Sequence, residues 1–481
     1  MPLILGTNSI KDTGYNIANS CRFNDDDAAY MHKTPGSAGN RRTFTYSGWL
    51  KRSNLVTAST YNHRFFGVND GASNEGFQFY THPNAAALHI NAGGGGGERI
   101  TNAQFRDTNA WYHVVVACDT TESTANDRIK LYVNGVQITS FATIVNPDQN
   151  EEGGINNDVE HTVGRQAATS RYYDGYMAEV CFIDGLALTP TSFGEFDEDS
   201  PTIWKPKDVS GLTFGTNGFY LDFEDSGNLG NDANGGTDLT EVNLAATDQA
   251  TDTPTNSFST LNLLATTDSI GNDITFSEGN CKITNTSDGG WHPAVGNIGA
   301  TSGKWYCEFK VATIGGASKY GIIDVDQYIE RVNFADSTRA YSYEYNSGDA
   351  YNGGNYDSDY GDSFTTNDII SVAMDLDNMK LYFAKNGTWQ DSGDPESGST
   401  GTGTHAYFGG GSATQRAAGV DTYAFAANIH NNSVTEANFG GCPAFTISSG
   451  NADANGYGNF EYSVPSGYYS LCTKNLAEYG G

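Results

Sequence analysis

Bulky side chains recur at every second position in many short segments of this chain. Residues 129–133 place Ile129, Leu131 and Val133 on one face, and residues 369–376 repeat the pattern. A period of two is typical of a half-buried β-strand, whereas an amphipathic helix has a longer period. The same alternation is found in 43–50 and 305–311. The hydrophobic pattern therefore predicts an all-β protein.

Two dipeptides predict tight hairpin turns. Asn134-Gly135 follows the strand pattern that ends at Val133, and Asn386-Gly387 follows another strand pattern in the second half of the chain. Asn-Gly is a strong hairpin signal because both residues accept a positive φ. The 58 glycines of the chain agree with many turns between short strands.

The strand patterns gather in two regions of a 481-residue chain, which is too long for one ordinary core. We expect two tandem antiparallel β-sandwich domains, at residues 15–204 and 263–440, after an N-terminal segment 1–14. Residues 205–262 predict a junction strand followed by a polar linker. The aromatic residues of 441–481 predict that this C-terminal segment packs on the sandwiches.

Charge limits the partners of the protein. The chain has 26 basic and 57 acidic residues and a net charge of −31, which repels phosphate backbones and anionic lipid and so disfavours nucleic acid. No apolar run approaches the roughly 18 residues of a membrane span, so we expect no membrane insertion. Residues 1–6 have no basic region and too short an apolar run for a signal peptide, which predicts synthesis in the cytoplasm without export.

The cysteines form no recognisable pattern. The chain has 7 of them, widely scattered and without a Cys-x-x-Cys pair. Several lie inside apolar strand patterns, such as Cys118 and Cys181. This placement favours buried thiols over disulfides or metal ligands.

The first region carries motifs of a known family. Residues 111–116 read WYHVVV, Asp119 follows, and residues 131–135 read LYVNG. Residues 174–190 run from DGYMAEV to DGLALTP. Over residues 15–200 this set resembles the laminin-G-like, concanavalin A-like jelly roll. The resemblance implies a lectin-like β-sandwich in this part of the chain.

The second region resembles a SPRY domain. Residues 303–308 read GKWYCE, residues 367–377 read NDIISVAMDLD, and residues 383–387 read FAKNG, in the order of that family's strands. Asn367 stands where the family usually has glycine, which puts one turn in doubt and leaves the fold as expected. The resemblance implies a second sandwich of SPRY type.

The combination of the two domains, together with residues 22–24 (RFN), 34–44 (TPGSAGNRRTF) and 189–195 (TPTSFGE), resembles virion proteins of marine tailed phages. Such proteins occur in tail fibres and appendages. The resemblance implies a place on the virion surface, other virion proteins as partners and a homo-oligomer. Our leading hypothesis is a non-enzymatic adhesin that binds host cell-surface polysaccharide. The alternatives are a capsid or tail decoration protein without a glycan ligand, and a glycan hydrolase.

Hydrolysis of a glycan requires two carboxylates that flank the scissile bond. Glucanases of the jelly-roll type use an E-x-D-x-(x)-E strand, and residues 195–199 (EFDED) are the nearest match. They lie between a Thr-Pro turn and Pro201 without an apolar strand around them, which favours a solvated turn. Asp324, Asp326 and Glu330 form a second, weaker match. We therefore assign no catalytic residue and expect no enzyme activity.

Asp119 and Asp127 bracket a hairpin loop. Some laminin-G-like domains bind Ca²⁺ at a sheet edge, so the resemblance makes these two carboxylates candidates for a calcium loop. The alternative is that they cap the loop through Asx turns.

Three aromatic residues of the second domain are candidates for a ligand site. Tyr351 and Tyr356 lie in a segment rich in Asn, Asp and Gly, and Trp389 follows the second Asn-Gly turn. Sugars stack C–H faces on aromatic rings, and their hydroxyls bond to amides and carboxylates. We hypothesise that the three residues form a shallow glycan site. The alternative is that Trp389 plugs the end of the sandwich and the tyrosines cover backbone.

Overall fold

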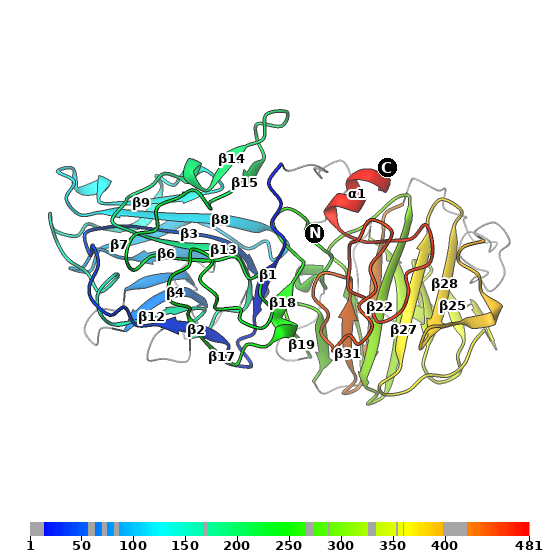
Figure 1. Cartoon of the computed structure of the whole chain (residues 1–481). Coiled ribbons are helices and arrows are strands. Elements are labelled where there is room, and N and C mark those ends of the chain that lie inside the picture. Colours follow the sequence, from blue (N-terminus) through cyan, green and yellow to red (C-terminus); the bar gives the residue numbers. More distant parts are fainter. Residues whose placement is uncertain are drawn as a thin grey trace. The chain divides into compact units, whose positions relative to one another are not determined.

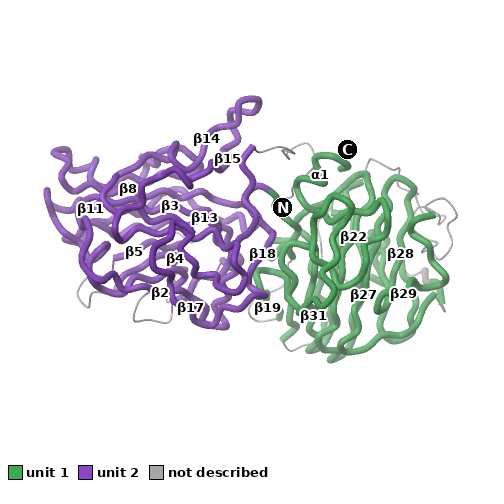
Figure 2. Tube along the Cα trace, in the orientation of Figure 1, with its two compact units in different colours: residues 1–12, 256–481 green, residues 13–255 purple. Residues whose placement is uncertain are grey.

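The computed structural model divides the chain into two compact units, which are purple and green in Figure 2. The N-terminal unit comprises Thr13–Thr255 and the C-terminal unit includes Asn256–Gly481. The structure describes residues 14–55, 63–69, 75–80, 86–166, 171–265, 273–286, 289–325, 333–352, 355–358, 360–397 and 421–480.

Two antiparallel sheets of eight strands each form the N-terminal unit (Figure 1). The order of the first is β10 (Val136–Gln137), β9 (Ile129–Val133), β8 (Trp111–Asp119), β3 (Thr43–Arg52), β13 (Gly175–Asp184), β1 (Ser20–Phe23) and β18 (Gln249–Ala250), with β16 (Phe219–Leu221) also paired to β13. The order of the second is β11 (Phe141–Val145), β7 (Glu98–Gln104), β6 (Ala87–Asn91), β5 (Gly76–Tyr80), β4 (His63–Asn69), β12 (Glu160–Val163), β2 (Tyr30–Lys33) and β17 (Thr240–Val242). A separate hairpin joins β14 (Gly194–Phe196) and β15 (Trp204–Pro206), and the 3-10 turns are η2 (Ala125–Asp127), η3 (Pro190–Ser192) and η4 (Ala246–Asp248).

Aromatic rings fill the core between these two sheets. The ring centroids of Tyr46 on β3 and Phe66 on β4 are 5.3 Å apart, and Phe66 stacks on Phe182 of β13 at 5.7 Å. Phe77 of β5 lies 5.4 Å from Tyr46. Because these rings come from both sheets, the large apolar area that each one buries joins the two layers.

The stretch 205–262 is divided between the units and differs from the expected linker. Strands β16, β17 and β18 add residues 219–250 to the two N-terminal sheets. Leu221 pairs with Val180 of β13, and Leu229 and Leu239 are buried in the same core. These isolated apolar residues hold a mostly polar segment against the sandwich, so the boundary falls after Thr255.

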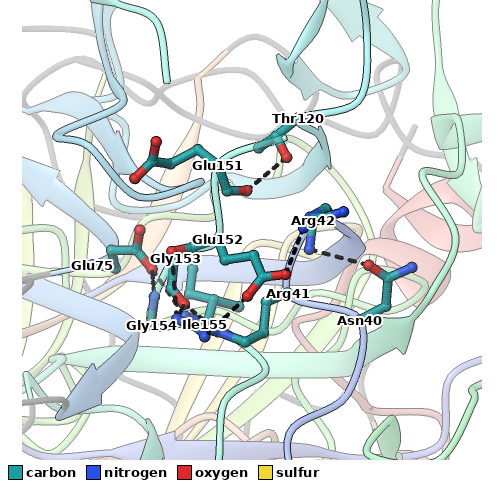
Figure 3. A network of polar contacts seen from close by, with 10 residues as sticks. All are labelled: Asn40, Arg41, Arg42, Glu75, Thr120, Glu151, Glu152, Gly153, Gly154 and Ile155. Atoms are coloured by element: carbon teal, nitrogen blue, oxygen red, sulfur yellow. Dashed lines mark hydrogen bonds and ion pairs between the residues drawn. The ribbon is translucent and has the colours of Figure 1, made fainter. Parts of the chain in front are cut away.

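A buried carboxylate organises the loops at one end of the N-terminal unit (Figure 3). Glu75 is 1% exposed, and its Oε1 accepts a hydrogen bond from the backbone N–H of Gly94 at 2.5 Å. Its Oε2 accepts hydrogen bonds from the N–H groups of Gly154 and Ile155 at 2.6 and 2.9 Å. Gly94 has φ +72°, a conformation that suits glycine. The glycine run at residues 93–97 is therefore part of a structural anchor.

The C-terminal unit has a sheet of eight strands and a sheet of six. The order of the first is β19 (Ile274–Ser277), β20 (Lys282–Asn285), β31 (Val434–Asn438), β22 (Lys304–Thr313), β27 (Ile369–Asp375), β28 (Lys380–Lys385) and β29 (Thr388–Trp389), with β32 (Tyr469–Ser470) parallel to β22. The order of the second is β21 (Trp291–Val295), β30 (Tyr423–His430), β23 (Ala317–Asp324), β24 (Ala340–Glu344), β25 (Ala350–Asn352) and β26 (Asn355–Asp357). The 3-10 turns are η5 (Leu263–Ala265), η6 (Phe334–Asp336) and η7 (Gln390–Ser392), and α1 (Thr473–Tyr479) follows β32.

Both expected Asn-Gly hairpins are present. Asn134 and Gly135 join β9 to β10, and Asn386 and Gly387 join β28 to β29. All four residues have a positive φ, between +48° and +79°. This backbone twist matches the twist of the flanking strands, which is why the sequence signal is reliable.

The C-terminal segment covers one face of the C-terminal unit. Phe460 and Tyr468 pack on Tyr306 and Tyr382, which lie on the outer face of the eight-stranded sheet. The ring of Phe460 meets Tyr306 edge-on with centroids 5.0 Å apart. A third layer thus lies on the sandwich, and it builds the site described below.

All seven cysteines are buried thiols outside any disulfide. In the described part of the chain, no helix combines the length and apolar character that crossing a membrane requires.

Candidate functional site

A pocket of about 400 Å³ opens on the outer face of the eight-stranded sheet of the C-terminal unit. Strands β22, β27, β28 and β29 supply its floor, and two loops supply its walls. We call it the Trp389 pocket. Its lining residues are Tyr306, Ser371, Ala384, Gly387, Trp389, Gly393, Asp394, Pro395, Glu396, Tyr462, Ser463, Val464 and Pro465.

The floor follows from strand alternation. Trp305 and Cys307 point into the sandwich core, so Tyr306 between them points outward. The hydroxyl of Tyr306 lies 2.9 Å from Oγ of Ser371 on the neighbouring strand β27. It also lies 3.0 Å from Oε1 of Glu308. The floor is therefore an aromatic surface with a fixed row of oxygen atoms.

Glu308 fastens the wall formed by residues 462–465. Its two carboxylate oxygens accept hydrogen bonds from the backbone N–H groups of Glu461 and Tyr462, at 2.9 and 2.8 Å. The side-chain amide of Asn438 donates a third hydrogen bond at 3.1 Å. Burial raises the pKa of Glu308 above its ordinary range, and these hydrogen bonds to the carboxylate oppose the rise.

Trp389 forms one side of the pocket and is half-buried. It lies opposite Ala384 in the register of β28 and β29, and it packs on the same aromatic cluster as Tyr306. The ring of Tyr462 lies against Gly387, where an added Cβ would be 2.6 Å from Cδ1 of the tyrosine. Glycine at the turn therefore allows two aromatic side chains to border one opening.

Two exposed carboxylates complete the other wall. Oδ1 of Asp394 accepts a hydrogen bond from the backbone N–H of Glu396 at 3.1 Å. Oε1 of Glu396 accepts one from the N–H of Ser466 at 3.0 Å. The second bond ties the loop after η7 to the C-terminal segment. The result is a pocket with aromatic rings on one side and carboxylates on the other.

Tyr351 and Trp389 do not share a site. Tyr351 lies opposite Ser342 on β24, whose neighbours Tyr341 and Tyr343 are in the core, so Tyr351 faces outward from the six-stranded sheet. Trp389 faces outward from the eight-stranded sheet, and the sandwich core separates the two side chains. The backbone of Tyr356 pairs with Tyr351, and its side chain lies outside the described residues.

Tyr351 belongs to a polar cluster of its own. Its hydroxyl donates to Oδ2 of Asp349 at 3.1 Å. Lys319 lies 5.7 Å from the centre of its ring, 3.6 Å from the ring of Trp291, and 2.9 Å from a carboxylate oxygen of Glu344. The protein's own lysine thus lies near both aromatic rings.

Asp119 and Asp127 act as parts of the loop. Oδ1 of Asp119 accepts hydrogen bonds from the backbone N–H and the hydroxyl of Thr121, at 3.0 and 2.6 Å. Asp127 lies 3.5 Å from Nζ of Lys130. In the ranges that the structure describes, no three His, Cys, Asp or Glu side chains gather in a way that would hold a metal ion. The geometry corresponds to the capping interpretation.

Described side chains of the two acidic motifs make local contacts. Residues 195–199 lie at the β14–β15 hairpin, where Oδ1 of Asp197 caps the turn and Lys205 lies 3.2 Å from Oδ2. Asp324 is 3.0 Å from the guanidinium of Arg339. Asp326 and Glu330 lie outside the described residues.

A serine–histidine contact, which the sequence did not indicate, resembles half of a hydrolytic triad. Oγ of Ser47 lies 2.9 Å from Nε2 of His113, and the indole N–H of Trp204 donates to Nδ1 of His113 at 2.9 Å. Because Nδ1 accepts this bond, the neutral imidazole carries its proton on Nε2 and donates to Ser47. Such a histidine cannot remove the serine proton, and both residues are buried. The contact is structural.

Glu179 is a second buried group, and it predicts a pH dependence of stability. It lies at a bulge of β13 with φ +50°, and its Oε2 accepts a hydrogen bond from the hydroxyl of Tyr220 at 2.8 Å. Burial raises the pKa of Glu179 to about 7. A raised carboxyl pKa contributes stability that is complete below the unfolded pKa and is lost as pH rises through the folded one. We expect about 3 kcal/mol of such loss between about pH 4.5 and pH 7.

Glu179→Gln removes this titration. Hydrogen exchange of β13 peptides in the full chain measures the opening free energy on both sides of this pH window. We expect the difference in opening free energy between wild type and variant to change by about 3 kcal/mol across the window. Glu122→Gln, at an exposed position of the same unit that is not among the groups acting on Glu179, serves as the control and leaves the profile unchanged. Parallel profiles for wild type and Glu179→Gln would contradict the assignment.

One comparison with known proteins found a family match within the N-terminal unit. Residues 24–192 match the family model of the concanavalin A-like lectin/glucanases superfamily. This match agrees with the resemblance that the motifs of this region indicated. Among proteins of curated function, none matches the chain.

Solved structures resemble parts of the chain at low similarity. The SPRY domain of human HERC1 is 16% identical, with 36% of this chain and 94% of that one covered and a TM-score of 0.27. A second human SPRY domain is 13% identical, with 34% and 94% covered and a TM-score of 0.25. A provisionally named carbohydrate binding protein from Bacteroides ovatus is 20% identical, with 47% and 58% covered and a TM-score of 0.29. Similarities of this size indicate nothing about ligands.

Proposed function

We propose that this protein is a carbohydrate-binding adhesin that does not hydrolyse its ligand. The Trp389 pocket carries the proposal. It offers a half-buried indole, two further aromatic side chains and several oxygen atoms within about 400 Å³. Binding sites for sugars need this combination, because the ring stacks on an aromatic face while the hydroxyls bond to polar groups. The match of residues 24–192 to a lectin and glucanase family supports a carbohydrate ligand.

The biological setting belongs to the same proposal. The protein is part of a tail fibre or appendage on a virion surface and attaches the particle to host cell-surface polysaccharide. Two sandwiches in tandem and the net charge of −31 suit an exposed, highly charged appendage. A single shallow pocket binds weakly, and assembly of several copies with other virion proteins would raise the avidity.

Trp389→Ala tests the pocket. We expect the variant to bind host envelope polysaccharide at least about thirtyfold more weakly, because truncation of a central aromatic side chain at a binding site costs about 2 kcal/mol or more. The measurement is the Kd of the recombinant full chain for purified polysaccharide, together with the melting temperature of each variant. The indole is only half-buried, so we expect a folded protein with a slightly lower melting temperature.

Tyr351→Ala is the matched control, because it removes an aromatic side chain from the outer face of the other sheet. We expect it to keep the wild-type affinity. Loss of binding in Tyr351→Ala and not in Trp389→Ala would reject the pocket. Wild-type protein that binds no host polysaccharide would favour a decoration protein. Release of reducing ends from the polysaccharide by wild-type protein would establish a hydrolase.

A further inference from the structure

The Trp389 pocket has a net negative charge. Asp394 and Glu396 both line it and both are exposed, and none of its lining residues is basic. Among the described residues, neither carboxylate has a cationic side chain within ion-pair distance. Two carboxylates beside one small pocket make its potential negative, which attracts a cation.

The hydrogen bonds of the two carboxylates leave one oxygen of each for a ligand. The backbone N–H groups of Glu396 and Ser397 both donate to Oδ1 of Asp394, at 3.1 and 3.3 Å. The N–H of Ser466 donates to Oε1 of Glu396. These bonds fix both side chains against the wall of the pocket and direct no described donor to Oδ2 of Asp394 or Oε2 of Glu396. Fixed acceptors bind a cation without first losing side-chain freedom.

The aromatic side of the pocket also favours a positively charged ligand. The rings of Trp389 and Tyr462 border the opening. The face of an indole or phenol ring attracts an ammonium group. An anionic sugar would meet two carboxylates and the negative faces of two rings, with no basic lining residue to pair with. The pocket thus selects against uronic acids and sulfated sugars.

We infer that the Trp389 pocket binds an amino sugar with a free ammonium group. The sugar ring stacks on Trp389, and the ammonium donates hydrogen bonds to Asp394 and Glu396. This inference rests on the proposed carbohydrate-binding function and adds the class of sugar. An acetylated amine has lost the charge and the extra donors, so N-acetylation abolishes the advantage.

The test compares two ligands that differ only at the amine. A short β-1,4-linked glucosamine oligosaccharide and its fully N-acetylated form are titrated calorimetrically into the full chain. We expect the free amine to bind at least about tenfold more tightly, because only the charged ammonium pairs with the two carboxylates. Salt at about 1 M shortens the Debye length to about 3 Å and is expected to reduce the preference.

A chain with a net charge of −31 attracts any cation, so the control must keep the total charge equal. The double variant Asp394→Asn with Glu396→Gln removes the two pocket carboxylates. The control variant Glu195→Gln with Glu198→Gln removes two carboxylates at the β14–β15 hairpin of the other unit. We expect the first to lose the preference for the amine and the second to retain it.

The outcomes separate this inference from the function on which it rests. Equal affinity for both oligosaccharides, with binding that still depends on Trp389, would reject the amino sugar and leave carbohydrate binding in place. An amine preference that survives in the pocket double variant would show nonspecific attraction and also reject the inference. Wild-type protein that binds neither oligosaccharide nor host polysaccharide would reject the proposed function itself.

Discussion

Glu308→Ala should lower the unfolding free energy of the C-terminal unit by about 4 kcal/mol, because several buried donors lose their acceptor at once. The side chain of Glu308 is inaccessible to solvent and accepts hydrogen bonds from two backbone N–H groups, the Asn438 amide and the Tyr306 hydroxyl. Because two of these bonds fasten the wall of the Trp389 pocket, we also expect loss of ligand binding. Hydrogen exchange at residues 459–465 and denaturant unfolding of the full chain measure both effects.

Glu436→Ala is a suitable control for this prediction. Glu436 lies on the neighbouring strand β31, and its carboxylate oxygens are 4.0 and 3.7 Å from Nζ of Lys282 and Lys310. Ion pairs of this kind contribute less than about 1 kcal/mol. Equal stabilities of Glu308→Ala and Glu436→Ala would show that Glu308 does not hold the wall.

Glu75→Ala should destabilise the N-terminal unit by a similar amount. The substitution leaves the N–H groups of Gly94, Gly154 and Ile155 without their acceptor, and each buried orphan donor costs about 1–3 kcal/mol. We expect a loss of about 4 kcal/mol in unfolding free energy and faster hydrogen exchange in both anchored loops.

Glu152→Gln tests whether an exposed carboxylate in the same network contributes as much stability as the buried carboxylate of Glu75. Glu152 pairs with Arg41 and Arg42 in the same network, but its side chain is 44% exposed. We expect a change below about 1 kcal/mol. A larger effect from Glu152→Gln than from Glu75→Ala would overturn the view that the buried carboxylate anchors the loops.

The fold could be predicted from local patterns because those patterns act over short distances. The Asn-Gly turns specify their own backbone twist, and alternation around Tyr306 already separates core residues from outward-facing ones. Neither pattern states which sheet a strand joins. Tyr351 and Trp389 both read as outward-facing loop aromatics, and only the long-range strand pairing places them on opposite faces.

The pocket itself was beyond sequence reasoning for a related reason. Its floor comes from four strands and one wall comes from residues 462–465, some 150 positions after Tyr306. One residue pointed to this covering wall: Glu308 is a carboxylate on the outward face of a strand, and its neighbour on that face is the aromatic Tyr306. A charged side chain at that position indicates a covering segment when it is buried, and burial is not visible in the sequence.

In the N-terminal unit, the first and last strands lie side by side. Ser20 of β1 pairs with Ala250 of β18, so the chain enters and leaves this sandwich on neighbouring strands. A domain whose ends are adjacent can be inserted into a loop of another protein without separating the two ends of that loop. This geometry suits transfer of the sandwich between proteins by gene rearrangement. Insertion at a loop would leave the fold of the recipient protein unchanged.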